Sequence, residues 1–272
     1  MIPAIRVEWR KLVTTRIWWV LGIVLFGYIA FTSALFGGLF GAIASGAIGP
    51  EAAGGEAIPT DGLPPLVYST VSAVGYVIPL ILGTLAVTGE VRHGTLTPTF
   101  LAIPSRARVL AAKLIVMLVA GAGLGVVGLV ASMGVGAGVL AVFEIDPQLG
   151  NPDIWAMAGR AVLAMALWAA IGVGVGSLIQ SQIAAVIVVI AFTQFVEPIL
   201  RTAAAFWEPA AQVGRFLPGA ASDALVGASV YAMFTGAAAD PLLWWQGGLV
   251  LAALAVLVSA IGWATTWRRD IT

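Results

Sequence analysis

The chain of 272 residues contains no cysteine and a single histidine, His93. Without cysteine, disulfide bonds and thiolate metal sites are excluded, while the cellular compartment stays open. One histidine excludes the usual metal hydrolases, which combine several histidines around the ion. The sequence also lacks GxxxxGK followed by Ser or Thr, so the chain cannot bind a nucleotide through a P-loop. We therefore expect no metal, no directly bound cofactor and no enzymatic activity of the chain's own.

Charged side chains are also scarce. They make up 10% of the chain, whereas hydrophobic residues make up 60%, above the ~45–50% of a soluble domain. A soluble domain could not cover its surface with so few charges, so the composition predicts an integral membrane protein. The 13 basic and 13 acidic residues give a net charge of zero, and we expect no nucleic-acid partner.

Long apolar runs predict an all-α membrane protein with one domain, residues 1–272. The runs are far longer than the ~9–11 residues of a barrel strand and do not alternate strictly. Six runs are long enough to be spanning helices: Ile17–Ala47, Leu66–Thr88, Val109–Phe143, Ile154–Ile179, Ile183–Leu200 and Leu242–Trp267.

The basic residues predict the orientation of these spans. Ten of the 13 lie in the N-terminal segment, the loop after the second span or the C-terminus: Arg6, Arg10, Lys11, Arg16, Arg92, Arg106, Arg108, Lys113, Arg268 and Arg269. With six spans, these three regions lie on one side, and lysine and arginine favour the cytoplasmic side. We expect a multi-pass protein of a bacterial plasma membrane with both termini in the cytoplasm.

Residues 1–16 form a predicted amphipathic interfacial helix. Ile2, Ile5, Trp9 and Leu12 recur at three- and four-residue spacing, with basic residues elsewhere around the helix. The alternative is a basic flank that only fixes the topology.

Glycines four residues apart recur within the predicted spans. They occur as Gly37/Gly41, Gly121/Gly125, Gly134/Gly138 and Gly172/Gly176. Because such pairs let helix backbones approach closely, they favour a tightly packed bundle.

The external segment 201–241 is apolar but interrupted by prolines, which predicts short re-entrant helices before the last span. Among the charged residues in or near it, four are candidate functional residues: Glu197, Arg201, Glu208 and Arg215. Glu197 and Arg201 are four apart and can pair. Two interpretations stay open, since these residues could line the exit route of a substrate or could cap and orient the short helices.

The charges of the chain concentrate in one polar stretch, Gly89–Lys113. Its charged and titratable residues are Glu90, Arg92, His93, Arg106, Arg108 and Lys113. The orientation places this stretch in the cytoplasm, which predicts a loop, 89–108, that is presented to a partner.

The motifs of this loop carry a resemblance to a known family. Glu90 is followed by Arg92-His93-Gly94-Thr95-Leu96, then by Leu101-x-x-Pro104-Ser105-Arg106-x-Arg108, and Lys113 opens a span. This pattern resembles the permease subunits of type 2 ABC transporters, and the layout of the whole chain is similar to theirs.

The resemblance implies that the loop holds a coupling helix, which docks on a separate ATPase subunit. Residues 95–100 would form that helix. The implied coupling residues are Glu90, Arg92, His93, Thr95, Leu96, Phe100, Leu101, Arg106 and Arg108. Among them, Leu96, Phe100 and Leu101 would be apolar anchors. Arg106 and Arg108 would pair with acids of the ATPase or with anionic lipid. Glu90 would satisfy the turn at Gly94.

The implied assembly is a homodimer of this chain with two ATPase subunits, which would bind ATP and Mg²⁺. Its function would be ATP-driven export of a hydrophobic or amphipathic compound, such as a drug, natural product, lipid or small peptide. The alternatives are a stand-alone channel or carrier, and a scaffold or immunity protein without transport.

Overall fold

The computed structural model describes residues 1–49, 59–206, 208–231 and 242–267, and every regular element in these ranges is helical. Five helical stretches are long and apolar enough to cross a membrane: α2 (Ile17–Ala44), α7 (Arg106–Val142), α8 (Pro152–Leu178), the stretch Gln182–Ala204 and the stretch Trp244–Trp267. The chain is thus a multi-pass membrane protein by helix length and composition.

Helix α8 is the central helix of the bundle, because its small residues let three neighbours approach. An added Cβ at Gly172 would meet the backbone of Leu80 on α5 (Val77–Arg92), and one at Gly121 would meet the backbone of Met165. At Gly174 it would meet Ser259 of α14 (Trp244–Gly262). The predicted pairs Gly121/Gly125 and Gly172/Gly176 thus lie at helix contacts, whereas the contact at Gly174 has no counterpart in the predicted spacing.

Not every predicted glycine pair lies at a contact. Gly134 and Gly138 have nothing within 4 Å of an added Cβ, so their face of α7 is open. Spacing alone predicts that a close approach is possible, and the rotation of the helix decides whether it occurs.

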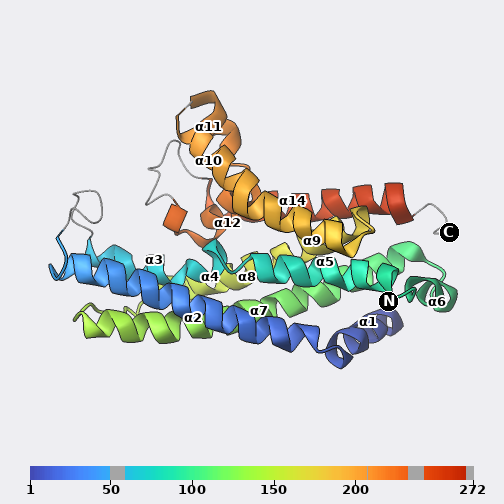
Figure 1. Ribbon diagram of the computed structural model, residues 1–272, viewed down its shortest axis with the longest axis horizontal. Helices are drawn as coiled ribbons and strands as arrows, with labels where there is room; N and C mark the ends of the chain where they lie inside the picture. Colours follow the sequence, from blue (N-terminus) through green and yellow to red (C-terminus); the bar gives the residue numbers. More distant parts are fainter. Residues whose placement is uncertain (50–58, 207, 232–241, 268–272) are drawn as a thin grey trace.

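The predicted second span, Leu66–Thr88, is not one helix. It is divided among α3 (Leu63–Tyr68), α4 (Thr70–Ala73) and α5. The hydroxyls of Ser69, Thr70 and Ser72 donate to backbone carbonyls three residues earlier, at 2.8, 2.8 and 2.9 Å. Such local bonds compete with the helical ladder, and they lie where the predicted span is interrupted. The three pieces still follow one another along the long axis of the bundle (Figure 1).

The fifth predicted span contains a break of another kind. Helix α9 (Gln182–Ala191) passes through a π-helical turn, Phe192–Val196, into α10 (Glu197–Ala205). The π turn leaves the Thr193 carbonyl able to accept a bond from the Tyr76 hydroxyl at 3.3 Å. The last span ends in a similar turn, Trp263–Trp267.

Short helices also occur where re-entrant helices are predicted. They are α11 (Glu208–Gly214) and α12 (Pro218–Val226), while residues 232–241 of the predicted segment lie outside the described residues. Their entry into the membrane stays a prediction.

The N-terminal helix and the loop helix lie at the same end of the molecule. Helix α1 (Ile2–Thr14), α6 (Leu96–Ala102) and the end of the last span gather at one end of the bundle, whereas α10 and α11 extend away from its middle (Figure 1). This end of the bundle holds a cluster of charged side chains.

Candidate functional site

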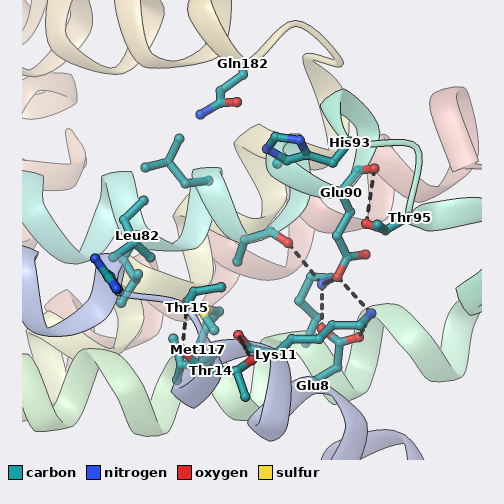
Figure 2. A pocket seen from close by; sticks show the side chains of 17 residues that line it. Glu8, Lys11, Thr14, Thr15, Leu82, Glu90, His93, Thr95, Met117 and Gln182 are labelled. Atoms are coloured by element: carbon teal, nitrogen blue, oxygen red, sulfur yellow. Dashed lines mark hydrogen bonds and ion pairs between the residues drawn. The ribbon is translucent and has the colours of Figure 1, made fainter.

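Four charged side chains form a closed ring between α1, α5 and α7. The Lys11 ammonium lies 2.8 Å from Glu8 Oε1 and 2.9 Å from Glu90 Oε1. The Lys113 ammonium lies 2.5 Å from Glu8 Oε2 and 2.8 Å from Glu90 Oε1. Each lysine therefore contacts both carboxylates, and acids and bases alternate around the ring. Figure 2 labels three members of the ring, Glu8, Lys11 and Glu90. We call these four residues the charge ring.

The ring joins segments that are far apart in sequence. Glu8 and Lys11 lie on the inward face of α1, together with buried Ala4, because residues three and four apart share a helix face. Glu90 lies near the end of α5, and Lys113 lies in the second turn of α7.

Each ammonium has a third acceptor, which completes its hydrogen bonding. Lys11 donates to Thr99 Oγ1 of α6 at 3.0 Å, and Lys113 donates to the Ala86 carbonyl at 3.0 Å. Thr99 in turn donates to the Thr95 carbonyl at 2.8 Å, within the same short helix. Through Thr99 the charge ring is connected to α6, so all four elements meet at one point.

The ring is largely buried. Relative exposure is 1% for the Lys113 side chain and 5% for Glu8, against 32% for Lys11. Burial by itself raises the pKa of the Glu8 carboxyl, but the charges and hydrogen bonds of the two lysines outweigh it and hold that pKa below its ordinary value of 4.5. Burial lowers the pKa of the Lys11 ammonium, but the bonds to both carboxylates raise it above 10.5. Both groups of α1 are therefore charged at neutral pH.

Only one of the three predicted apolar anchors of α6 is strongly exposed. Leu96 is buried in the core of the chain itself, at 3% exposure, whereas Leu101 is 81% exposed. Phe100 packs edge-on against Trp267 of the last span, with ring centroids 5.5 Å apart. Of the three predicted anchors, Leu101 is the one that points away from the bundle.

Some basic residues of the loop also contact other parts of the chain, and others are exposed. Arg106 lies with its guanidinium 5.3 Å from the Phe100 ring and donates to the Trp267 carbonyl at 2.5 Å, so it holds α6 to the end of the last span. Arg92 donates to Gln182 at 3.3 Å, while His93 and Arg108 are exposed.

The Glu90 side chain does not satisfy the turn at Gly94 in the way that the resemblance implies. Gly94 has a φ of +65°, a left-handed conformation that glycine adopts without strain. The Glu90 backbone carbonyl, not its carboxylate, closes this turn by accepting from the Thr95 N–H at 3.0 Å. The carboxylate belongs to the charge ring, and its Oε2 has no hydrogen-bond donor among the described residues.

A second polar cluster lies around α10 and α12. Glu197, 2% exposed, accepts from the N–H groups of Gly219 and Ala220 in the first turn of α12. Arg201 forms an ion pair with Asp223 at 2.5 Å, not with Glu197 as its spacing predicts. Glu197 thus caps one short helix, and the bundle geometry gives Arg201 a partner 22 residues away.

The other two predicted residues of this region are Arg215 and Glu208. The Arg215 guanidinium lies 5.1 Å from the Phe216 ring. The side chain of Glu208 lies outside the described residues. The capping interpretation accounts for Glu197 and Arg201, and the exit-route interpretation stays a prediction.

Four charged contributors to these clusters are absent from the predicted site residues: Glu8, Lys11, Lys113 and Asp223. The signal for the first two is present in the sequence, since they are the acid and the base at i and i+3 of an amphipathic helix. Asp223 has no such local signal, because its partner is on a different helix.

No cluster of three or more His, Asp or Glu side chains among the described residues could hold a metal ion. The chain also matches no protein-family model, and no curated protein matches it at a significant level.

Proposed function

We propose that this chain is the membrane subunit of an ATP-driven exporter of the type 2 ABC class, working as a homodimer with two separate ATPase subunits. The observation that supports this best is the position of α6. It is a short helix between two predicted spans, held to the charge ring through Thr99 and exposing Leu101 near its C-terminus. A partner that binds α6 has a direct mechanical connection to the bundle.

The connection has two branches. Through Thr99 and Lys11, a displacement of α6 reaches α1, and through Glu90 and Lys113 the same ring reaches α5 and α7. Through Phe100 and Arg106 it reaches the end of the last span. Buried ion pairs tolerate little change in geometry, because a broken pair leaves an uncompensated buried charge. ATP-driven movement of the docked ATPases would therefore move α5, α7 and the last span together.

The layout supports a cytoplasmic position for both termini. The pieces α3, α4 and α5 follow one another along the bundle (Figure 1), as a sixth crossing requires. Six crossings put α1, α6 and the end of the last span on one side, and lysine and arginine are most frequent there.

The cargo is a hydrophobic or amphipathic compound, as the resemblance implies. A stand-alone channel or carrier is distinguished by transport in reconstituted vesicles without nucleotide. A scaffold or immunity protein is distinguished by the absence of cargo-stimulated ATP hydrolysis in the complex.

The test is co-purification with the ATPase subunit co-expressed from a neighbouring gene. Leu101→Asp and Arg108→Glu change exposed side chains of the loop, so the fold should persist while ATPase recovery falls at least tenfold. Leu149→Asp is the matched control, because Leu149 is 42% exposed and lies in the connection that follows the opposite end of α7. Equal ATPase recovery with Leu101→Asp and Leu149→Asp would reject the docking role of α6.

A further inference from the structure

Two cavities meet beside α1, and their linings differ in chemistry. The polar cavity, about 540 Å³, is bounded by the charge ring, Arg16, His93 and Gln182. The apolar cavity, about 590 Å³, lies between α1, α2, α5 and α7 and is walled by tryptophan and aliphatic side chains. Leu12 and Leu82 line both cavities, so the two adjoin. Each volume is within the ~300–1,000 Å³ of ligand sites.

The polar cavity carries a surplus positive charge. Its lining contains Glu8 and Glu90 but three permanent cations, Lys11, Lys113 and Arg16. Both lysines already donate three hydrogen bonds each, which is their full number. Arg16 differs, because it is exposed and has no ion-pair partner among the described residues. Its planar guanidinium is suited to a phosphate group.

The tryptophan side chains of the apolar cavity mark the boundary between lipid headgroups and hydrocarbon. Trp9, Trp18 and Trp19 line it and are 45%, 41% and 44% exposed. Tryptophan concentrates at the boundary between headgroups and hydrocarbon, since its ring is apolar and its N–H is polar. A ligand with its charge at Arg16 would therefore place a hydrocarbon chain past these rings.

We propose that the joined cavities bind one anionic phospholipid, with its phosphate on Arg16 and an acyl chain in the apolar cavity. A single net negative charge matches the single surplus cation, and the lysines of the charge ring add a favourable field without donating further bonds. The occupant lies between α1 and the bundle, so it stabilises the docked position of α1. The charge ring borders this site and also belongs to the proposed coupling path, but the proposal does not rest on export, because binding of the lipid requires neither an ATPase nor a cargo.

The experiment is native mass spectrometry of the purified full chain, with phosphatidylglycerol or phosphatidylcholine of identical acyl chains added. We expect at least fivefold more retained phosphatidylglycerol. Arg16→Gln should reduce its retention to the phosphatidylcholine level, whereas Arg10→Gln should not, because exposed Arg10 lines neither cavity. Inorganic phosphate at millimolar concentration should not displace the lipid, since it lacks the acyl chain.

A second pair of variants tests the apolar cavity. Gly123 lines it with nothing within 4 Å of an added Cβ, so Gly123→Phe should fill it and abolish retention of the lipid. Gly134→Phe is the matched control, since Gly134 is equally open on the same helix but lies outside both cavities. Equal loss of phosphatidylglycerol with Arg16→Gln and Arg10→Gln, or unchanged retention with Gly123→Phe, would overturn the proposal.

Discussion

The ammonium of Lys113 lies 2.8 Å from the Glu90 carboxylate, so the residues that flank the polar loop on α5 and α7 are joined beneath it. Helix α6 lies between them in sequence and contacts the same charge ring through Thr99. The loop is therefore fixed at both ends and in its middle, although much of its outer surface is exposed. A docking helix needs this combination of a rigid base and an accessible face.

Breaking the charge ring on one side should destabilise the protein strongly. In Lys113→Met both carboxylates lose a buried counter-ion, and we expect a loss of about 3–5 kcal/mol. The double variant Lys113→Met/Glu90→Gln removes one acid as well and should recover part of that loss. The measurement is thermal unfolding of the purified chain, and a double variant no more stable than the single one would contradict the pairing.

Stability should depend on pH at both extremes. The pKa of Glu8 is lower in the folded state, so its contribution is present above the unfolded value of 4.5 and is lost as pH falls through the folded pKa. The pKa of Lys11 is raised, so its contribution is present below 10.5 and is lost as pH rises through the folded value. The unfolding temperature of the wild type should therefore fall on the acid side more steeply than that of Glu8→Gln. Parallel acid limbs for the two proteins would exclude this role of Glu8.

The contact between α5 and α8 should tolerate no added methyl group. Gly172→Ala places a Cβ against the Leu80 backbone, and overpacking of this kind costs about 1–3 kcal/mol. Gly159→Ala, on the same helix, has open space around the new Cβ and should be neutral or slightly stabilising. The unfolding temperatures of the two variants test this packing. We expect a lower unfolding temperature for Gly172→Ala and not for Gly159→Ala.

The role of Glu197 is tested by comparing an amide with an alanine. Glu197→Gln keeps an oxygen that can accept from the Gly219 N–H, so the cap on α12 and the stability should persist. Glu197→Ala removes the cap and should cost about 0.5–2 kcal/mol. If the glutamine variant is as unstable as the alanine variant in thermal unfolding, a charged side chain is required and the capping role is insufficient.

The class of the protein and the position of its helices follow largely from the sequence. Hydropathy is a local property, so the apolar runs predicted the membrane class, and five of the six predicted spans occur as long apolar helices. The second run is also apolar but is divided among three helices, and the hydroxyls of Ser69, Thr70 and Ser72 bond to nearby carbonyls at the division. Average hydropathy does not register such local competition.

The candidate site was only partly predictable. Gly89–Lys113 was identified from its concentration of charge, and the short helix inside it occurs at Leu96–Ala102. Which side chains of that helix face outward depends on how it rests on its neighbours. Leu96 and Leu101 are the same residue type in one loop, yet Leu96 is 3% exposed and Leu101 is 81% exposed.

The sequence by itself determined that this chain is helical, apolar enough for lipid, and positively charged mainly in one loop and at its ends. Only the tertiary structure decided which charges meet. Glu8 and Lys113 are 105 residues apart, and Arg201 pairs with Asp223 across two helices. The reason is that burial forces each charge to find an opposite one, while the rotation and spacing of the helices decide which one lies within reach.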